Sequence, residues 1–515
     1  MNSYLDSMGR LREDLLRADY LATPVLEAIG EQGQRGLSRN HTIPASHALA
    51  GREDGLATLI RLFVLQQCQP AEQVARVLDV SSLLELGILT RSGDGFRAKM
   101  DVRPYEDETD QTSGWVVSDQ APGLDARDAR PRPDYVLGIS PASVSLSQIT
   151  PRREVGRALD LGTGSGAQSL HLVRHAGQVV ATDVNPRALT AATLTFALNE
   201  VDVATRLGSL YEPVEAETFD LITTNPPFVI SPDLGPRLAY RETGHRSDDL
   251  MRAVVSGAGP LLNPGGSLHV VGNWAHVARE DWRERLAGWI PRGCDAFVVE
   301  RELLDPYEYI EVWLADAGRR GGPGYVQDYE QWLAYFDALE IEAVGMGWIT
   351  MVNTGSSSPR VVCESWPHPV RQPVATDLMA HVAAMEYTAW SEEQILDRPW
   401  VLAPGAVQEV TSPPGRPDEP TRIVLRRGDG LQRAIEVDAG VGGILGACDG
   451  ELPLGRIIAA VAHVLDSDPM DLQTQTMPLL RSLISQTWLT PMATSYDETP
   501  AFARAAQLAK VMSAP

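Results

Sequence analysis

Residues 160–166 of the chain read DLGTGSG, and this stretch decides the predicted fold. It follows an apolar segment that ends at Leu161 and precedes the helical pattern AQSLHLV, so it joins a β-strand to an α-helix. Its three glycines let the backbone turn tightly and approach a ligand closely. The first amides of the following helix face the same ligand. The sequence therefore predicts a nucleotide-type cofactor loop.

Strand and helix signals alternate around this loop, which indicates a parallel α/β sheet. The segment that carries the alternation runs from about residue 130 to 360 and is predicted as one domain. Its strands are expected at 157–161, 178–183, 219–224, 267–273, 296–302 and 343–353.

The regions on either side of this domain have different patterns. Residues 1–120 are predicted as a mainly helical domain that ends in two helices and a two-stranded wing at the turn RSGDG, an order typical of winged-helix modules. Residues 361–515 are predicted as an α+β domain with a hairpin that turns at residues 428–430. Its last part, two amphipathic helices and a WLT strand, resembles a winged-helix or PqqD-like peptide-recognition module.

Composition and charge narrow the classes of function. The chain has 515 residues, with 44 basic and 68 acidic side chains and a formal net charge of −24. This charge repels a long phosphate backbone, which argues against a nucleic-acid substrate unless basic residues cluster locally. The sequence shows no signal-peptide core and no stretch of about 20 apolar residues, so no membrane span and a cytoplasmic location are expected.

Cysteine and histidine usage predicts neither disulfides nor a metal site. The four cysteines lie far apart, at Cys68, Cys294, Cys363 and Cys448. They form no Cys-x-x-Cys pair, so they are expected to be buried free thiols in a reducing compartment. His171 and His175 are one helical turn apart without a third ligand, so they are expected at the surface and edge of a helix.

Two carboxylates help to choose between cofactors for the glycine loop. The loop and the alanine after it also satisfy the G-x-G-x-x-A pattern of NAD-binding loops. Asp160 precedes the first glycine, where its carboxylate can hold the ammonium of S-adenosyl-L-methionine but would repel a pyrophosphate. Asp183, at the end of the second strand, can accept from both ribose hydroxyls of either cofactor. The loop carboxylate favours S-adenosyl-L-methionine, with an NAD-linked oxidoreductase as the alternative.

The stretch Asn225-Pro226-Pro227-Phe228 follows the apolar strand FDLITT. The Asn225 side-chain carbonyl and the Pro226 main-chain carbonyl can each accept one N–H of a substrate NH₂ group and aim its nitrogen at a methyl donor. Phe228 can stack on the flat group that carries this nitrogen, and the two prolines stiffen the loop. Asn225, Pro226 and Phe228 are the candidate catalytic residues, and together with Pro227 they form the candidate substrate site.

In combination, DLGTGSG, TDVNPRAL and TNPPF resemble the class I methyltransferases with an Asn-Pro-Pro-(Tyr/Phe) motif. This group contains the release-factor glutamine-N5 methyltransferases and the adenine-N6 and guanine-N2 nucleic-acid methyltransferases. The resemblance covers residues 130–360 and implies a Rossmann-like, seven-stranded core that transfers a methyl group from S-adenosylmethionine to a planar nitrogen. The cofactor-binding residues that it implies are Asp160, Gly162, Thr163, Gly164, Gly166, Asp183, Asn185, Ser209 and Asn225.

Two segments are less well matched to this group. Where many members have an Asp in a DLF-like segment that meets the adenine amino group, this chain has Ser209, which hydrogen-bonds more weakly than a carboxylate. Residues 240–250 lie where relatives build a substrate-facing lip, although their charges are equally typical of a solvated loop.

The sequence leaves the methyl acceptor open. The acidic charge favours a protein glutamine amide, whereas the predicted winged helices and the Asn-Pro-Pro-Phe form favour an RNA or DNA base, at adenine N6 or guanine N2. A macromolecular partner is expected, with protein slightly favoured over nucleic acid. A catalytically retired binding module is the hypothesis from another class, and the joint retention of Asp160, Asp183, Asn225 and Phe228 counts against it.

Overall fold

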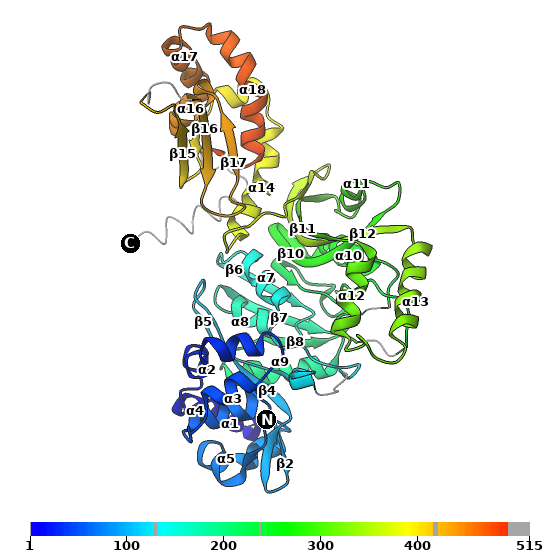
Figure 1. The fold of residues 1–515 in the computed structure, drawn as a ribbon. Helices are drawn as coiled ribbons and strands as arrows, with labels where there is room; N and C mark the ends of the chain where they lie inside the picture. The colour runs from blue at the N-terminus through cyan, green and yellow to red at the C-terminus, as the bar shows by residue number, and fades with distance from the viewer. Residues whose placement is uncertain (1, 127–130, 236–237, 243, 416–420, 493–515) are drawn as a thin grey trace.

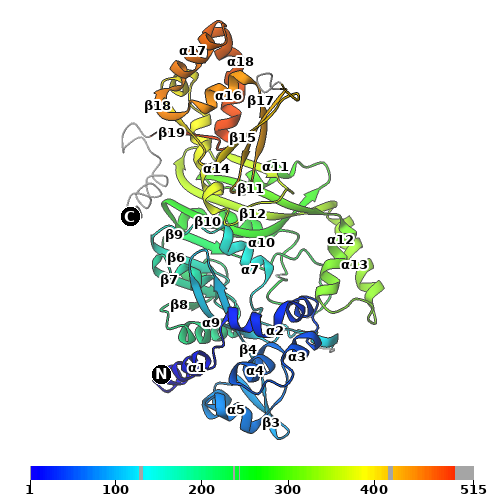
Figure 2. The ribbon, with the colours of Figure 1, turned by 60° about the vertical axis from the view of Figure 1, so that its left-hand side comes forward.

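The computed structural model describes residues 2–126, 131–235, 238–242, 244–415 and 421–492. The end of the predicted C-terminal domain, residues 493–515, lies outside the described residues. Three regions follow one another along the long axis of the molecule (Figure 1). The N-terminal helices lie at one end, a large sheet with helices lies in the middle, and the C-terminal region lies at the other end, as Figure 2 also shows.

The central sheet has eight strands among the described residues, in the order β13-β11-β12-β10-β9-β6-β7-β8. The strands are β6 (Val155–Leu161), β7 (Ala176–Asp183), β8 (Ala204–Leu207), β9 (Phe219–Thr224), β10 (Leu262–Val277), β11 (Gly293–Leu304), β12 (Ile341–Ser356) and β13 (Val361–Ser365). The run from β8 to β10 is parallel, and β12 is antiparallel to both of its neighbours. This arrangement confirms the Rossmann-like α/β core.

The sheet differs from the prediction in two short strands. β8 supplies the edge beside β7, and its residues are exposed or half-buried, so it lacks the apolar pattern of a buried strand. β13 pairs parallel to β11 and adds an eighth strand just beyond the predicted boundary at residue 360. The seven strands from β6 to β12 lie within residues 130–360, as expected, and the eighth lies outside this range.

Helices cover both faces of the sheet, and side-chain alternation along β11 shows how. Ala296 and Val298 pack into the core under α10 (Asp249–Ala258) and α11 (Trp282–Ala287). Phe297 and Val299 point to the other face, under α7 (Pro141–Ile149) and α14 (Ala375–Thr388). Successive residues of a strand face opposite sides, so an apolar run such as AFVV serves two cores. The remaining helices of this region are α8 (Ala167–Leu172), α9 (Pro186–Leu198), α12 (Pro306–Asp316) and α13 (Tyr325–Ala338).

The N-terminal region is mainly helical up to a small three-stranded sheet, in the order β1-β3-β2. Its elements are α1 (Asn2–Arg17), α2 (Ala22–Leu37), α3 (Ile43–Ala48), α4 (Gly55–Leu59), η1 (Ile60–Val64), β1 (Gln69–Pro70), α5 (Ala71–Val77), α6 (Val80–Glu85), β2 (Leu89–Ser92) and β3 (Gly95–Ala98). A long ribbon that was not predicted follows, formed by β4 (Met100–Asp107) and β5 (Thr112–Asp119). Trp115 and Val117 of β5 share a core with Leu194 and Leu198 of α9. The N-terminal region is thereby packed against the central one.

The C-terminal region contains two further three-stranded sheets, β15-β16-β17 and β18-β14-β19. Its elements after α14 are α15 (Glu392–Leu396), β14 (Pro399–Leu402), β15 (Ala406–Thr411), β16 (Arg422–Arg427), β17 (Ala434–Val437), α16 (Ala439–Gly446), β18 (Asp449–Pro453), α17 (Leu454–Val464), α18 (Pro469–Ser485) and β19 (Leu489–Pro491). The expected hairpin is formed by β16 and β17. One apolar core runs from α17 and α18 through α14 to Phe297 and Trp348 of the central sheet.

The four cysteines are all free, as expected, but they are not all buried. Cys294 and Cys448 are buried and Cys363 is half-buried, whereas Cys68 is exposed beside the short strand β1. The expectation of four buried thiols was therefore wrong for Cys68. Among the described residues, no helix has both the length and the apolar character that crossing a bilayer would require.

Candidate functional site

A cavity of about 330 Å³ opens at the carboxyl ends of β6, β7 and β9. Ligands of open α/β sheets bind at this edge, because the loops that follow the parallel strands converge there. The predicted site residues that line it are Asp160, Gly162, Thr163, Gly164, Asp183, Asn185, Ser209, Asn225, Pro226 and Pro227. Two predicted residues, Gly166 and Phe228, do not line it.

The glycine loop is tied to the end of β7. The amides of Gly162 and Thr163 both donate to the Thr182 carbonyl, at 2.9 and 2.8 Å. Gly162 has φ +73° and Gly164 has φ +56°, a region that disfavours side chains with a Cβ. The backbone conformation of the loop therefore favours glycine at both positions.

Gly166 is required for a different reason from the one expected. It is the N-cap of α8 with φ +85°, and a Cβ on it would lie 2.7 Å from Cε1 of Phe196 in α9. Close packing of α8 against α9 therefore explains this glycine.

Asp160 is buried in the wall of the cavity, with only 2% of its surface exposed. Its Oδ2 accepts hydrogen bonds from the hydroxyls of Thr163 and Ser169, both at 2.7 Å. Burial raises the pKa of Asp160 to about 6, because the charged form is poorly solvated. A cation in the cavity would stabilise the ionised carboxylate.

Asp183 is held by the backbone on both of its oxygens. Oδ2 accepts from the amide of Gly164 at 2.9 Å and Oδ1 accepts from the amide of Asn185 at 2.8 Å. Burial raises the pKa of Asp183. Each carboxylate oxygen can accept more than one hydrogen bond, so the pair remains able to accept from two ligand hydroxyls.

Asn185 and Ser209 line the cavity on either side of Asp183. The side chain of Asn185 caps α9 by accepting from the amide of Arg187, and it donates to the carbonyl of Asp134 at 3.1 Å. Its side chain thus fixes the chain around residue 134, which covers the cavity. Beside Ser209, the Gly208 amide donates to the Asp183 carbonyl at 3.0 Å.

Asn225 presents an unmatched acceptor to the site. It follows β9, whose end is fixed where the Thr224 hydroxyl donates to the Leu161 carbonyl at 2.7 Å. Its side-chain oxygen, Oδ1, is buried and has no hydrogen-bond partner among the described residues. A buried acceptor without a partner costs about 1–3 kcal/mol, so this oxygen is prepared to accept an N–H from a ligand. Pro226 and Pro227 continue the cavity wall beside it.

Phe228 points away from the cavity and does not form the expected stacking platform. Its ring meets the ring of Trp313 in α12 edge to face, with centroids 5.9 Å apart. The next two residues are also anchored, since the Val229 amide donates to the Arg241 carbonyl and the Ile230 amide donates to the Tyr309 hydroxyl, both at 2.9 Å. The Asn-Pro-Pro-Phe loop is therefore held between the cavity and α12.

The predicted lip contributes some of its residues to the site. Tyr240, Glu242 and His245 line the cavity, and the ring of Tyr240 meets that of Tyr135 at a centroid distance of 5.4 Å. Asp248, in contrast, faces inward and pairs with Arg285.

The segment before β6 was missed as part of the site. Its residues that line the cavity are Tyr135, Val136, Leu137, Gly138, Ser140 and Ser143. The last two form a capping box at the start of α7. The Ser-Pro-x-Ser pattern that produces this box is a helix-start signal, and it could have drawn attention to the loop before it.

The two histidines of α8 and its C-terminal turn are buried, contrary to the expectation of a surface position. His171 is 4% exposed, and its two ring nitrogens contact Asp110 Oδ2 at 2.7 Å and the Tyr105 hydroxyl at 2.8 Å. His171 lies close enough to Asp107 and Asp110 for the three to form a candidate metal group. Arg152 pairs with both aspartates, so one guanidinium already shares these two carboxylates with His171.

Residues 138–286 match the family model described as Methyltransferase small domain. This range includes the glycine loop, Asp183 and the Asn-Pro-Pro-Phe loop, so the match confirms the resemblance to class I methyltransferases. Two further models, described as domains of unknown function, match residues 17–99 and 379–491.

Relatives of this chain are named for two kinds of activity. The ribosomal RNA small subunit methyltransferase C of Alcanivorax borkumensis is 33% identical over 118 residues, which cover 23% of this chain and 32% of that protein. The release factor glutamine methyltransferase of Geobacter sulfurreducens is 32% identical over 181 residues, which cover 29% of this chain and 63% of that protein. For the enzyme of the same name from Deinococcus radiodurans, the identity is 33%, with 32% of this chain and 61% of that protein covered. The chain thus spans between 32% and 63% of the length of these relatives.

Solved structures that match this chain include a T. thermophilus 16S rRNA methyltransferase in complex with AdoMet and guanosine. The identity is 19% and the TM-score 0.26, with 43% of this chain and 58% of that chain covered. A methyltransferase from Pyrococcus furiosus matches with 24% identity and a TM-score of 0.21, covering 26% of this chain and 64% of that one.

Proposed function

We propose that this chain is an S-adenosylmethionine-dependent methyltransferase that acts on a planar nitrogen. The observation that carries the proposal is the buried, unpartnered Oδ1 of Asn225, which lies beside a cavity walled by Asp160 and Asp183. An N–H group of the acceptor would donate a hydrogen bond to Asn225 Oδ1. The carboxylate of Asp160 would bind a cationic amine, and that of Asp183 would bind a ribose.

Some residues of the cavity bind the cofactor and others bind the methyl acceptor. Asp160 holds the ammonium of the methionine part, and Asp183 accepts from the ribose hydroxyls. When bound, S-adenosylmethionine supplies an electrophilic methyl group on a positively charged sulfur. Asn225 Oδ1 and the Pro226 carbonyl accept the two N–H groups of the substrate, which localises the nitrogen lone pair toward that methyl group.

Methyl transfer needs no strong base at Asn225. The nitrogen lone pair forms the new N–C bond while the S–C bond breaks, and that electron pair stays on sulfur as a neutral thioether. The nitrogen becomes cationic and then loses its proton readily to water. The proposed role of the protein is therefore orientation and exclusion of water, supplied by the anchored Asn-Pro-Pro-Phe loop.

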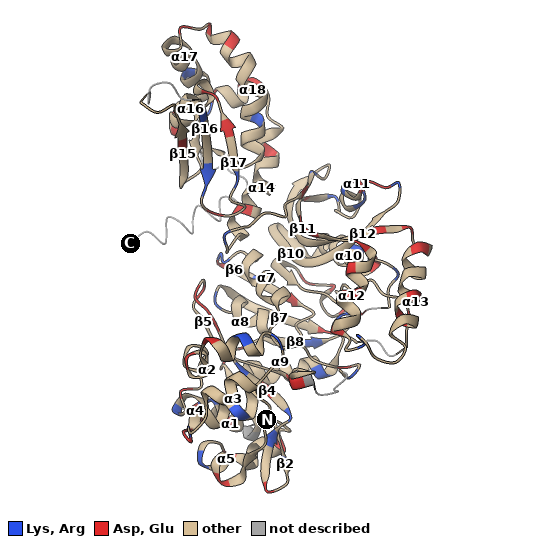
Figure 3. Ribbon diagram, in the orientation of Figure 1, with Lys and Arg blue, Asp and Glu red and all other residues tan. Residues whose placement is uncertain are grey.

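A protein amide is the favoured acceptor. The helices α12 and α13, which flank the Asn-Pro-Pro-Phe loop, contain six carboxylates and no Lys or Arg. Figure 3 shows acidic positions on both helices. A phosphate backbone that approached along them would be repelled, whereas a protein segment with a glutamine side chain would not.

A nucleic-acid base is the second candidate. It is supported by the identity of 33% to a ribosomal RNA methyltransferase and by the Asn-Pro-Pro-Phe form of the loop. Both acceptors present the same NH₂ geometry to Asn225, so the chemistry at the cavity is common to the two.

The experiment that tests the proposal is methyl transfer from labelled S-adenosylmethionine to a desalted cell extract. Separate aliquots are then treated with protease and with nuclease. Loss of macromolecular label with protease alone supports a protein acceptor, and loss with nuclease alone supports a base. The absence of any transferred label would contradict the methyltransferase proposal.

A further inference from the structure

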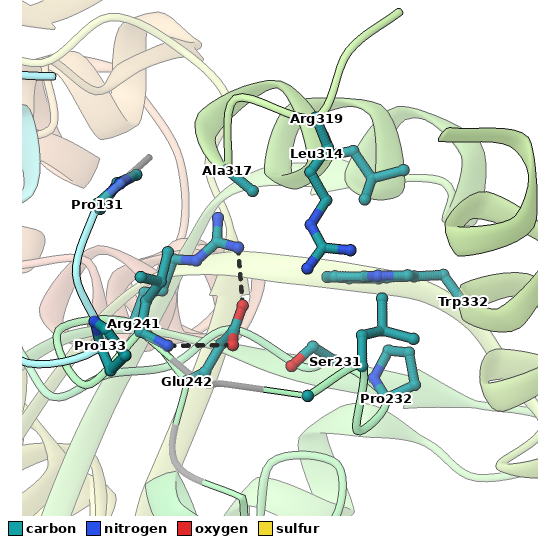
Figure 4. Close-up of a pocket in the computed structure, with 13 residues that line it drawn as sticks. Pro131, Pro133, Ser231, Pro232, Arg241, Glu242, Leu314, Ala317, Arg319 and Trp332 are labelled. Atoms are coloured by element: carbon teal, nitrogen blue, oxygen red, sulfur yellow. Dashed lines mark hydrogen bonds and ion pairs between the residues drawn. The ribbon is translucent and has the colours of Figure 1, made fainter. Parts of the chain in front are cut away.

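A second cavity, of about 210 Å³, adjoins the first one on the side of α12 and α13. Figure 4 shows its walls, which come from three parts of the chain. Its lining residues include Ser231, Arg241, Glu242, Ala317, Arg319 and Trp332. Glu242 lines both cavities. Pro227 lines the first cavity and Ser231 lines the second. The two residues are four positions apart in the chain, so their Cα atoms lie at most about 14 Å apart.

Two buried donors in the walls of this cavity have no partner among the described residues, namely Nε1 of Trp332 and Nε of Arg241. Trp332 is 2% exposed and Arg241 is 5% exposed, so water does not replace the missing acceptors freely. The other guanidinium nitrogens of Arg241 are occupied by the Trp313 carbonyl at 2.9 Å, Asp316 at 2.8 Å and Glu242 at 2.7 Å. Buried donors are nearly always paired in proteins. These two belong to residues that line one cavity, where a ligand has room to supply the acceptors.

The charges around the cavity indicate that this acceptor is neutral. The two guanidinium groups, of Arg241 and Arg319, are paired with three carboxylates, of Glu242, Asp316 and Asp328. The carboxylates thus outnumber the guanidinium groups by one. A phosphate or carboxylate ligand would add a further negative charge in a place where charges are poorly solvated. A carbonyl oxygen accepts the same hydrogen bonds without that penalty.

The size and lining of the cavity fit part of a peptide. Ligand pockets commonly measure about 300–1,000 Å³, so a cavity of about 210 Å³ can take only a small part of a larger acceptor. Prolines and leucines make up much of the remaining wall. Apolar walls with a few hydrogen-bond donors are suited to a peptide segment.

We propose that this cavity binds the peptide segment next to the methylated side chain, whose main-chain carbonyls accept from Trp332 Nε1 and from Arg241 Nε. The inference rests on the proposed function and narrows its acceptor to a protein. Trp332 is then a determinant of acceptor specificity, whereas Asn225 in the first cavity orients the nitrogen that receives the methyl group.

The test compares Trp332→Phe, which removes the indole N–H but keeps an aromatic ring, with Trp488→Phe. Trp488 is a matched control, because its indole nitrogen is also buried without a partner but lies in the C-terminal core. A third variant, Ala317→Leu, narrows the cavity without removing a donor. For each protein the initial rate of label transfer into cell protein is measured at limiting extract concentrations, together with the affinity for S-adenosylmethionine.

We expect Trp332→Phe to lower kcat/KM for cell protein by about three- to tenfold, the effect of one lost hydrogen bond. Ala317→Leu should lower it as well, while Trp488→Phe and the cofactor affinities stay unchanged. Transfer should also depend weakly on salt between 50 and 200 mM, unlike the roughly thousandfold loss typical of binding through many phosphates.

Two results would overturn the inference while the methyltransferase proposal survives. One is an unaltered kcat/KM in both Trp332→Phe and Ala317→Leu. The other is label that nuclease removes, with a steep salt dependence. If the unaltered protein binds no S-adenosylmethionine and transfers no label, the proposed function itself fails, and the inference fails with it.

Discussion

Replacement of Asp160 by asparagine tests how the first cavity recognises a cofactor. The carboxylate is buried and already accepts two hydroxyl hydrogen bonds on one oxygen, which the amide oxygen of an asparagine can also accept. The variant therefore keeps the local packing but loses the negative charge. A hydrogen bond to a charged group contributes about 1.5–3 kcal/mol, so the affinity for S-adenosylmethionine should fall roughly ten- to hundredfold at pH 7.

The same carboxylate should make cofactor binding depend on pH. With a pKa of about 6, Asp160 is mostly ionised at pH 7 and only about one tenth ionised at pH 5. If the ionised form binds the ammonium, the affinity of the unaltered protein falls about tenfold over this range. Asp183, whose pKa is also raised by burial, adds to the fall in the same direction. The Asp160→Asn variant should therefore show a smaller dependence.

Calorimetric titration with S-adenosylmethionine at pH 5, 6 and 7 measures both effects. Asp202→Asn is the matched control, because Asp202 is exposed and lies outside the cavity. If Asp160→Asn binds S-adenosylmethionine as tightly as the unaltered protein at pH 7, the charge of Asp160 does not contribute to cofactor binding. Equal pH profiles for the two proteins would likewise show that Asp160 does not face the ammonium.

Further predictions concern stability and the loop that follows β9. Without cofactor, Asp160→Asn should raise the free energy of unfolding at pH 7 by up to about 3 kcal/mol, because burial raises the pKa of this carboxyl from 3.8 to about 6. The gain should disappear as the pH falls below about 4, where the carboxyl is protonated in both states, and thermal unfolding between pH 4 and 7 checks the sign. Gly166→Ala should destabilise the fold more than Gly162→Ala. A Cβ added at Gly166 would lie 2.7 Å from Phe196, whereas a Cβ added at Gly162 would meet no atom within 4 Å. Equal loss of stability for the two variants in urea denaturation would contradict this packing role of Gly166. Phe228→Leu should reduce methyl transfer more than cofactor affinity, because its ring anchors the loop on α12 outside the cavity, and a reduction in cofactor affinity alone would contradict that position.

The apolar strands of the central sheet were predictable because they are buried on both faces. FDLITT in β9 and AFVVERE in β11 carry runs of apolar residues that an edge strand does not need. The short strand β8 (ATRL) carries no such run, and in β13 (VVCES) the apolar run is only three residues long. Local pattern therefore located the inside of the sheet but missed its edges.

The candidate site was predictable where chemistry depends on a short motif. Asp160, Asp183 and Asn225 are each placed by the strand that precedes them, so their convergence follows from a parallel sheet. The position of Phe228 depends instead on Trp313 in a distant helix, and the burial of His171 depends on the unpredicted β4–β5 ribbon. Such long-range packing leaves no local signal in the sequence.

The role of Asn225 in orienting the acceptor nitrogen is tested by comparing methyl transfer by the unaltered protein, Asn225→Ala and Asn263→Ala. Asn263 is a matched control, because it lies at the start of β10 and donates to Asp220, away from both cavities. We predict that Asn225→Ala lowers the rate at least about 100-fold, the scale expected when a reacting nitrogen is no longer oriented, while Asn263→Ala and the cofactor affinity change little. Equal transfer rates for Asn225→Ala and the unaltered protein would contradict the proposed role of Asn225 in methyl transfer.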